Sequence, residues 1–512
     1  MVTQGEAPQR EGGLHLDDFT LAKVPVRKPS ASDRWLKYLG VPAAALILIY
    51  LLLMPTPAGL TLCGQKALAV FAMALVLWVT EPVPNYVASL LLMVMLVTMG
   101  VWEEKKVLGV LGMDVIWLNV TAFILSSVLV KTNLAKRLAL QIAVKFGRRA
   151  LPALLAFLAL QLVLAALVPA TAARSVMTLP IIMIVAAVYG STVKNPNNFG
   201  KNLALLNLQG INIFSSGYLT GSTCNIMAAA FIFDMTSHKV YYSEWLLGAF
   251  PVVLCAMLLS CYLGPRLLFR LTPAQEQPSV PGGIDALTGE LSKMGAVTRA
   301  EWHGALIFGL VLLLWVTDKY HKALFGFEIS PVMAALIGCV IALSPRIGLL
   351  KWNEADIPWH LLIFSAGAYA GGLALTESGA AQWLVDSVFE IFAIKPGINF
   401  WALYSIIIAV SMFSHIVFTS KTIRTIILIP MIIAIANRLG FNPVALALPA
   451  AFTLSWVVTL PISGKPNVLF YGTNQYSIGD NLLSGLAVCA IGTVLFILAG
   501  LTLYRAIGIV PY

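Results

Sequence analysis

Two arginines stand in apolar surroundings at matching places in the two halves of the chain. Arg174 lies in Ala170-Thr-Ala-Ala-Arg-Ser-Val-Met-Thr-Leu-Pro180, and Arg424 lies in Ser420-Lys-Thr-Ile-Arg-Thr-Ile-Ile-Leu-Ile-Pro430, so each arginine precedes a proline by six residues. A guanidinium presents a planar fork of donors that matches a carboxylate or a sulfonate. The pattern predicts two anion-binding groups related by an internal repeat.

Two lysines extend this set of cations. Lys421 belongs to the second stretch, and Lys465 lies in Leu460-Pro-Ile-Ser-Gly-Lys-Pro-Asn467. A charged side chain at the centre of a bilayer costs about 2.5–3.5 kcal/mol on insertion scales, so four of them cost on the order of 10 kcal/mol without compensation. Carboxylates are scarce, since Asp234 and Glu377 fall near the ends of apolar segments. An anionic ligand, helped by helix N-termini, is the natural counter-charge.

Short polar side chains accompany the cations in both halves. Thr220-Gly-Ser-Thr-Cys-Asn225 interrupts one apolar segment and Leu460–Asn467 interrupts another. The predicted substrate-binding residues are Thr171, Arg174, Ser222, Thr223, Asn225, Ser420, Lys421, Thr422, Arg424, Ser463, Lys465 and Asn467. Two other interpretations stay open, because arginines can tie down loop carbonyls and hydroxyls can satisfy the backbone at helix breaks.

The elements that carry these residues are membrane spans. Of the 512 residues 59% are hydrophobic and 11% are charged, which is too little charge to cover a soluble protein of this size. Apolar runs long enough to cross a hydrocarbon core recur along the chain. We expect eleven crossings, at about 40–55, 64–80, 84–100, 115–132, 202–237, 244–265, 303–318, 330–344, 359–376, 443–474 and 482–504. The net charge of +10 then follows from the positive-inside rule, with a cytoplasmic N-terminus, and does not indicate nucleic acid.

The domain organisation follows from the repeat. We expect a cytoplasmic tail over 1–37, a first half over 38–270, a cytoplasmic linker over 271–301 and a second half over 302–512. Each half contains a broken apolar piece, 151–189 and 398–436, which we interpret as a re-entrant hairpin. An odd number of crossings separates the two copies, so they face opposite ways, as in secondary transporters. The predicted fold is an all-α polytopic membrane protein with two inverted repeats.

A specific resemblance emerges from Thr80-Glu-Pro-Val-Pro84, the two hairpin tips, the two interruptions, and the stretch Leu460–Gly472 with Ile478-Gly-Asp480. Over about residues 60–505 the chain resembles the divalent-anion/sodium symporter family, which includes di- and tricarboxylate carriers. The resemblance implies that Asn and Thr side chains of a Ser-Asn-Thr tip hold substrate carboxylates, while nearby carbonyls and hydroxyls hold Na⁺. It also implies a homodimer in which scaffold domains meet and a mobile domain carries the hairpins.

Both tips depart from that motif. The first reads Ala170-Thr171-Ala172 and lacks the flanking hydroxyls, the second has Lys421 in place of Asn, and Lys465 stands where the family usually has an uncharged residue. A Na⁺ site needs oxygen ligands and no fixed cation nearby. We therefore expect weak or absent Na⁺ dependence. An empty carrier with uncompensated cations crosses the bilayer at a cost, which favours exchange of anions over net uptake.

Other functions stay open at this point. A buried lysine can lose its proton near neutral pH, so proton coupling is an alternative, as are a Na⁺-coupled symporter and a membrane anion sensor that does not transport. No P-loop, nucleophile elbow or metal spacing occurs, so we predict no catalytic residues, metal site or cofactor. The six cysteines are interpreted as small buried hydrophobes, and His415 as a hydrogen-bonded buried imidazole. The predicted partners are a small organic anion, membrane lipids and a second copy of the chain.

Overall fold

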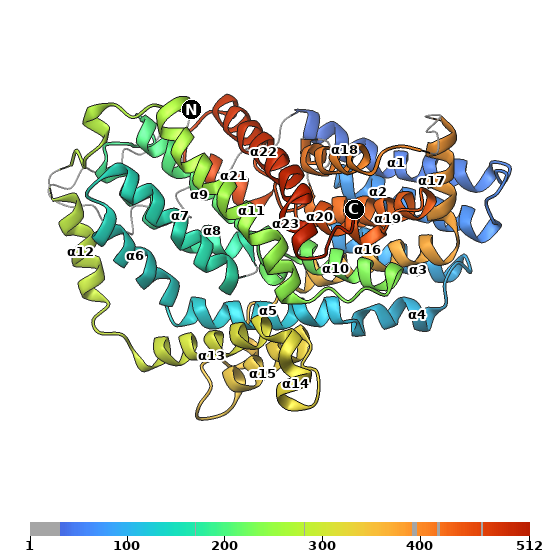
Figure 1. The fold of residues 1–512 in the computed structure, drawn as a ribbon, viewed down its shortest axis with the longest axis horizontal. Helices are drawn as coiled ribbons and strands as arrows, with labels where there is room; N and C mark the ends of the chain where they lie inside the picture. The colour runs from blue at the N-terminus through green and yellow to red at the C-terminus, as the bar shows by residue number, and fades with distance from the viewer. Residues whose placement is uncertain (1–30, 169, 281, 392–396, 417–419, 462–463) are drawn as a thin grey trace.

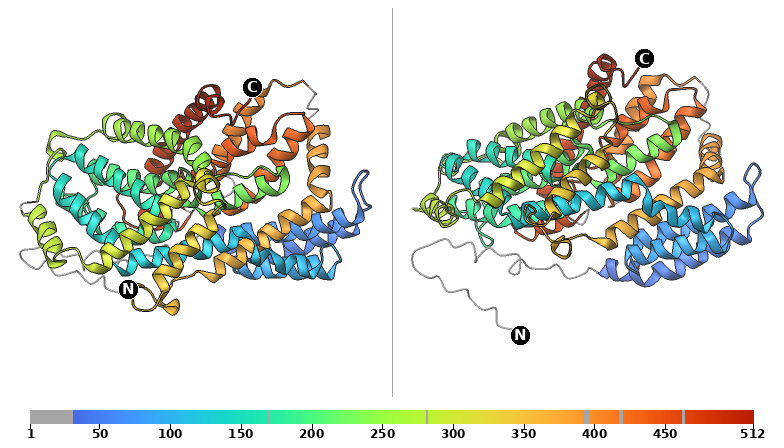
Figure 2. Two further views of the ribbon diagram at one scale, coloured as in Figure 1. Left: turned by 60° about the horizontal axis from the view of Figure 1, so that its bottom comes forward. Right: turned by 90° about the horizontal axis from the view of Figure 1, so that it is seen from below.

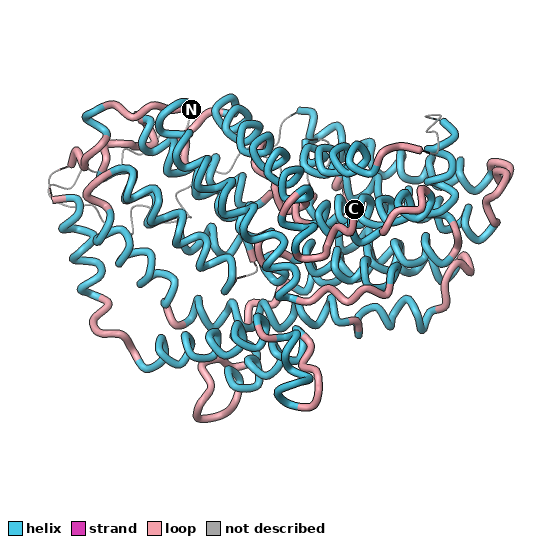
Figure 3. Tube along the Cα trace, viewed as in Figure 1, coloured by secondary structure: helices cyan, strands magenta, loops and turns pink. Residues whose placement is uncertain are grey.

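The computed structural model describes residues 31–512 apart from 169, 281, 392–396, 417–419 and 462–463, and this described part is helical, without β-strands (Figure 3). Before the linker the main helices are α1 (Ala31–Leu53), α2 (Leu62–Thr80), α3 (Asn85–Thr98), α4 (Glu104–Gly109), α5 (Asp114–Lys131), α6 (Leu134–Phe146), α7 (Ala150–Leu167), α8 (Thr171–Val188), α9 (Asn198–Ser216), α10 (Thr223–Thr236) and α11 (Tyr242–Leu263) (Figure 1). After it come α13 (Arg299–Val316), α14 (His321–Phe325), α15 (Pro331–Leu343), α16 (Trp359–Glu377), α17 (Ala380–Ile391), α18 (Phe400–Phe413), α19 (Lys421–Arg438), α20 (Pro443–Ala451), α21 (Lys465–Tyr471), α22 (Ile478–Leu501) and α23 (Leu503–Ala506).

The length and composition of these helices are those of a membrane protein. Eight helical segments in the described part have at least 18 residues and are apolar enough to cross a bilayer, and five shorter helices are also apolar. The predicted all-α polytopic fold is confirmed. The expected number of eleven crossings and the re-entrant nature of the hairpins remain predictions.

The helices form two layers (Figure 2). In one layer α1, α2, α3 and α16 pack in succession, and α16 continues through α5 to α15 and α13. In the other, α7, α8 and α11 pack around α9, and α22, α18, α20, α19 and α10 continue from α11. The layers meet where α16 and α17 pack against α19, and where α5 packs against α10.

Each broken apolar piece forms a pair of helices joined by a short tip. The first pair is α7 and α8, and the second is α18 and α19. The residue before a proline is disfavoured in the helical region, and Val168, which precedes Pro169, ends α7 in an extended conformation. At the second tip the Ser420 hydroxyl caps α19 by accepting a hydrogen bond from the Ile423 amide at 3.4 Å. Both second arms contain the matched prolines, Pro180 and Pro430.

Two elements differ from the expected organisation. The segment expected to be a linker contains a helix, α12 (Gly283–Lys293), which packs against α6. Its amphipathic sequence is short and flanked by glycines, so it resembles a loop when only hydropathy is considered. At the N-terminus, α1 begins at Ala31, inside the segment expected to be the tail.

Candidate functional site

Two buried asparagines hold the two interruptions in the same way. Asn225 Nδ2 donates to the Ser215 carbonyl at 2.7 Å and to the Tyr218 carbonyl at 2.9 Å, ten and seven residues earlier in the chain. Asn467 Nδ2 donates to the carbonyls of Val457 and Leu460 at 3.0 and 3.1 Å, with the same sequence separations. Each amide thus satisfies carbonyls freed by a helix break, and its oxygen remains available to other groups.

The first interruption depends on a close approach of its backbone. A Cβ at Gly221 would lie 2.3 Å from the Ser215 carbonyl oxygen, the same oxygen that accepts from Asn225. A side chain at this position would displace the segment that the asparagine holds. Glycine is therefore required here by packing rather than by a positive φ angle.

Lys421 connects the second tip to both halves. Its Nζ donates to Asn212 Oδ1 at 2.7 Å, and Asn212 Nδ2 lies 3.3 Å from Asn467 Oδ1. Asn212 is on α9 in the first half, and Asn467 is at the start of α21 in the second. The lysine ammonium is therefore linked through the Asn212 amide to Asn467, and it takes up an amide oxygen of the kind that can also bind a metal cation.

Arg174 is fully buried and only partly satisfied. Its Nη2 donates to the Ile211 carbonyl at 3.0 Å and to the Ser215 hydroxyl, both near the C-terminal end of α9. Its Nε and Nη1 atoms have no hydrogen-bond partner among the described residues. A buried donor without a partner is costly, so these two nitrogens make Arg174 a candidate for binding a ligand.

Arg424 is also fully buried, but the protein itself satisfies its nitrogens. Nε donates to the Ser414 hydroxyl at 2.8 Å, Nη1 to the Leu454 carbonyl at 3.1 Å, and Nη2 to the Ser411 carbonyl at 2.5 Å. These groups belong to the arm of its own hairpin and to the break after α20. The interpretation that an arginine ties down loop carbonyls therefore describes Arg424 well.

The three cations form one cluster without a described acidic partner. Lys421 lies close enough to Arg174 and to Arg424 for its charge to interact with each of them. The ion pairs within the described part of the chain join other residues, and none includes any of these three. Asp234, one of the two carboxylates near the ends of the apolar segments, accepts a hydrogen bond from Tyr369.

The predicted short polar side chains lie at the starts of the helices that follow the tips and the first interruption. Ser222 is buried at the start of α10, and the half-buried Thr223 follows it. Thr171 at the first tip and Thr422 at the second are half-buried first-turn residues of α8 and α19. The Cys224 thiol lies 3.1 Å from Ser455 Oγ and 3.2 Å from Ser222 Oγ, so the view of this cysteine as a plain hydrophobe is wrong.

Lys465 differs from the other predicted cations in its exposure to solvent. Lys465 is the first residue of α21 and is exposed, so it is not one of the buried cations, contrary to expectation. The first turn of this helix buries Pro466 and Asn467, which leaves the lysine on the opposite face. Ser463 lies outside the described residues.

Three residues of the site were not predicted. Asn212, Ser215 and Ser455 each bond a predicted residue, since Asn212 binds Lys421, Ser215 binds Arg174 and Ser455 Oγ donates to Asn225 Oδ1 at 3.0 Å. A signal for two of them exists in the sequence of α9. Its buried polar side chains are Asn202, Asn207, Gln209, Asn212, Ser215 and Ser216. Amides and hydroxyls within a membrane span indicate a functional face.

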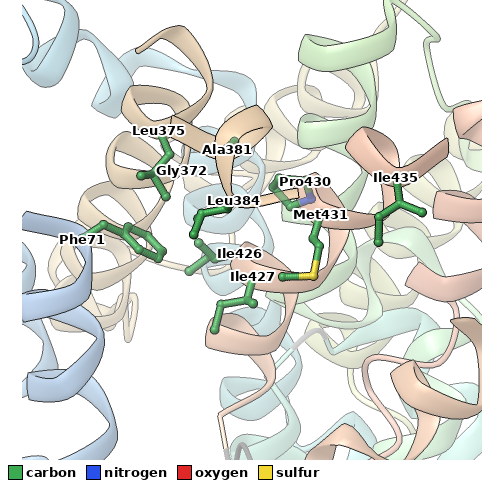
Figure 4. Close-up of a pocket in the computed structure, with 10 residues that line it drawn as sticks. All are labelled: Phe71, Gly372, Leu375, Ala381, Leu384, Ile426, Ile427, Pro430, Met431 and Ile435. Carbon is green, nitrogen blue, oxygen red and sulfur yellow. The ribbon is translucent and has the colours of Figure 1, made fainter. Parts of the chain in front are cut away.

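An apolar pocket lies apart from this cluster, between α19 and the layer that contains α2 and α16 (Figure 4). Phe71, Gly372, Ile426, Pro430 and Met431 are among the side chains that line it. None of its lining residues is charged, so it does not suit an anion. It lies at the contact between the two layers.

His415 behaves as expected. Its Nδ1 lies 2.7 Å from the Met412 carbonyl oxygen and its Nε2 lies 2.8 Å from Thr459 Oγ1, so both ring nitrogens of this buried side chain have a partner. The prediction of a hydrogen-bonded buried imidazole is confirmed.

Comparison with known proteins finds similarity to membrane transporters. A family model described as the sodium:sulfate symporter transmembrane region matches residues 32–510. A protein of Cupriavidus necator named only "Membrane protein" is 28% identical over 508 residues, 95% of each chain. The sodium-dependent dicarboxylate transporter SdcS of Staphylococcus saprophyticus is 24% identical over 90% of each chain. The protein of the same name from Staphylococcus aureus is 25% identical over 93% of this chain and 92% of its own.

Proposed function

The chain belongs to the sodium:sulfate symporter family, the divalent-anion/sodium symporters, and from this premise we propose that it exchanges small organic dianions or trianions across the inner membrane without Na⁺. Its substrates are di- or tricarboxylates or similar anions. The family is one of membrane transporters, and the relatives include dicarboxylate carriers by name.

One observation carries the proposal: Arg174, Lys421 and Arg424 are clustered without an ion-pair partner in the described chain. Uncompensated cations at membrane depth are costly, and a bound anion removes that cost. Arg174 supplies the free donors, and Lys421 adds a compact charge at the opposite tip. Thr171, Thr422, Ser222, Thr223, Ser420 and Ser463 are the proposed hydroxyl contacts. Asn225 and Asn467 fix the backbone of the two interruptions.

The Lys421 ammonium supports independence from Na⁺. It donates to Asn212 Oδ1, whose amide in turn donates to Asn467, so a fixed cation already occupies an amide oxygen next to the second tip. A sodium ion placed there would be repelled by it. Lys465 is exposed and contributes little to this effect.

Exchange follows from the charge of the empty carrier. The unloaded site retains its cations, whereas a loaded site is neutralised, so the loaded form crosses the membrane more readily. We propose that the layer with α8, α10, α19 and α21 moves against the other, in a homodimer with inverted repeats and a cytoplasmic N-terminus. The apolar pocket between α19 and α16 supports such a sliding contact.

Counterflow into proteoliposomes tests the proposal. Vesicles loaded with one dicarboxylate should take up a labelled one at the same rate in Na⁺, K⁺ or choline, and unloaded vesicles should take up little. A requirement for Na⁺ would refute the independence, and uptake that follows a pH gradient would favour proton coupling.

A Na⁺-coupled dicarboxylate symporter is the second candidate, because relatives at 24–25% identity carry the name sodium-dependent dicarboxylate transporter. It predicts net uptake into unloaded vesicles that follows the Na⁺ gradient. The same experiment therefore separates the two candidates.

A further inference from the structure

An open cleft lies between the start of α7 and the end of α11, far in sequence from the hairpin tips. Helix α11 continues at its end into a five-residue π-helix, Gly264–Leu268. Residues of α11, of the π-helix and of the segment after it line the cleft. The cavity amounts to about 660 Å³. That lies within the roughly 300–1,000 Å³ of a small-molecule site, so the cleft has room for a polar headgroup.

Positive charge dominates the lining. Three arginines, Arg149, Arg266 and Arg270, face one carboxylate, that of Glu276. None of the four takes part in an ion pair within the described part of the chain. The Arg266 guanidinium lies 4.0 Å from the centre of the Tyr262 ring, which restricts its position.

The backbone at the start of α7 adds to the positive charge of the cleft. Arg149 is the N-cap of α7, so the positive end of the helix dipole points to the cleft. The Ala150 amide donates to the Glu276 carbonyl at 3.0 Å, which fastens the segment after α11 to the start of α7. Guanidinium groups at a helix N-terminus match the oxygens of a phosphate group.

Exposed apolar side chains lie on both helices that flank the cleft. On α11, Leu258, Leu259 and Tyr262 are exposed within one and a half turns of the π-helix. On α7, Leu155 and Val163 are exposed along the neighbouring helix. Both helices are long and apolar enough to span a bilayer, and they contact each other. A ligand with acyl chains can therefore follow this surface with its headgroup in the cleft.

We propose that this cleft binds the phosphate headgroup of an anionic phospholipid, with the acyl chains on the exposed surface of α7 and α11. Basic pockets between transmembrane helices are established sites for such headgroups. The site fastens the base of the first hairpin to the linker segment. The inference is independent of the substrate and coupling proposed above.

The test uses purified, delipidated full-length protein and measures its melting temperature with added phosphatidylglycerol, phosphatidylcholine or inorganic phosphate. Phosphatidylglycerol should stabilise the protein more than phosphatidylcholine does, because a ligand that binds the folded state shifts unfolding upward. Inorganic phosphate should have no comparable effect. Native mass spectrometry of the wild type should show phosphatidylglycerol retained in preference to phosphatidylcholine.

Variants locate the site. The triple variant Arg149→Gln, Arg266→Gln, Arg270→Gln should lose at least half of the stabilisation specific to phosphatidylglycerol. The matched control Arg148→Gln, Arg299→Gln, Arg346→Gln removes the same charge from exposed arginines outside the cleft and should keep it. If the triple variant cannot be purified, the single variants are measured and the largest loss should fall within the cleft.

Three outcomes overturn the proposal. Equal stabilisation by both lipids removes the preference for anionic headgroups. Undiminished stabilisation in the cleft variants places the lipid elsewhere. An equal effect of inorganic phosphate makes the ligand a free anion rather than a lipid.

Discussion

The two hairpin tips place an arginine at the same repeat position, yet the two side chains are held differently. All three guanidinium nitrogens of Arg424 donate hydrogen bonds, to Ser411, Ser414 and Leu454. Two nitrogens of Arg174 are instead buried without a described partner. Duplicated positions can therefore diverge in role while keeping their residue type. This difference supports a structural task for Arg424 and a ligand-binding task for Arg174.

The tips differ in a second cation as well. The second tip carries Lys421, whose ammonium bonds Asn212, while the first has only Thr171 between two alanines. One tip therefore presents a fixed fork of donors and the other a compact charge on a flexible stem. An anion bound between them would be oriented by Arg174 and neutralised further by Lys421.

The largest effect is expected from Arg424→Gln, because hydrogen bonds to charged groups are worth about 1.5–3 kcal/mol each and three are lost. The variant should unfold at a clearly lower temperature, measured by fluorescence-detected size exclusion after heating. Arg424→Lys should fall almost as far, since an ammonium cannot reach all three acceptors. A variant with normal stability and no substrate affinity would instead make Arg424 a ligand-binding group.

Arg174→Gln should fold normally and bind substrate about 10–100-fold more weakly, from the loss of charge-assisted hydrogen bonds to the anion. Without substrate its melting temperature should equal or exceed that of the wild type, because an uncompensated buried charge is removed. Isothermal titration and thermal unfolding on the same preparation measure both quantities. Unchanged affinity would disprove the proposed division of roles between the tips.

Lys421→Asn should alter the response to Na⁺. Exchange without Na⁺ should fall about tenfold, as a variant that loses one charge contact would show, and added Na⁺ should restore part of it. Recovery stays incomplete because Ala170 and Ala172 provide no hydroxyls at the first tip. Counterflow in Na⁺ and in choline measures the effect, and normal exchange in choline would show that Lys421 is not needed.

The smallest effect is expected from Lys465→Thr. The lysine is exposed and has no ion-pair partner in the described structure, so exchange should change less than about twofold. The double variant with Lys421→Asn should behave like the single Lys421 variant. A large effect of Lys465→Thr in either background would contradict the exposed position.

Much of the fold could be predicted from hydropathy and from the repeat. The expected crossings at 64–80 and 359–376 correspond to α2 (Leu62–Thr80) and α16 (Trp359–Glu377). The break after α20 is harder to locate, because residues 452–458 are buried and mostly apolar yet not helical. Hydropathy reports burial, and in a membrane protein it does not show where a buried backbone leaves the helix.

For the site, the matched asparagines could be predicted because each half of the chain has an interrupted apolar segment that ends in an asparagine. The bonds of Asn225 and Asn467 repeat with equal sequence separations. Asn212 could not be found in this way, since its counterpart position in the repeat is apolar Leu454. The exposure of Lys465 depends on how the short helix α21 is rotated, which two buried neighbours decide.

The packing of the tips has a consequence for synthesis of the chain. The second arm of the first hairpin, α8, packs against α21 of the second half, whereas α19 of the second hairpin packs against α10 of the first. Helix α10 is therefore already synthesised when α19 is made. Helix α8, in contrast, can pack against α21 only after the chain has been synthesised as far as Tyr471. At about 5–20 residues per second that interval is on the order of tens of seconds. The first tip, with the unsatisfied Arg174, thus lacks this partner helix for most of the time in which the second half is synthesised.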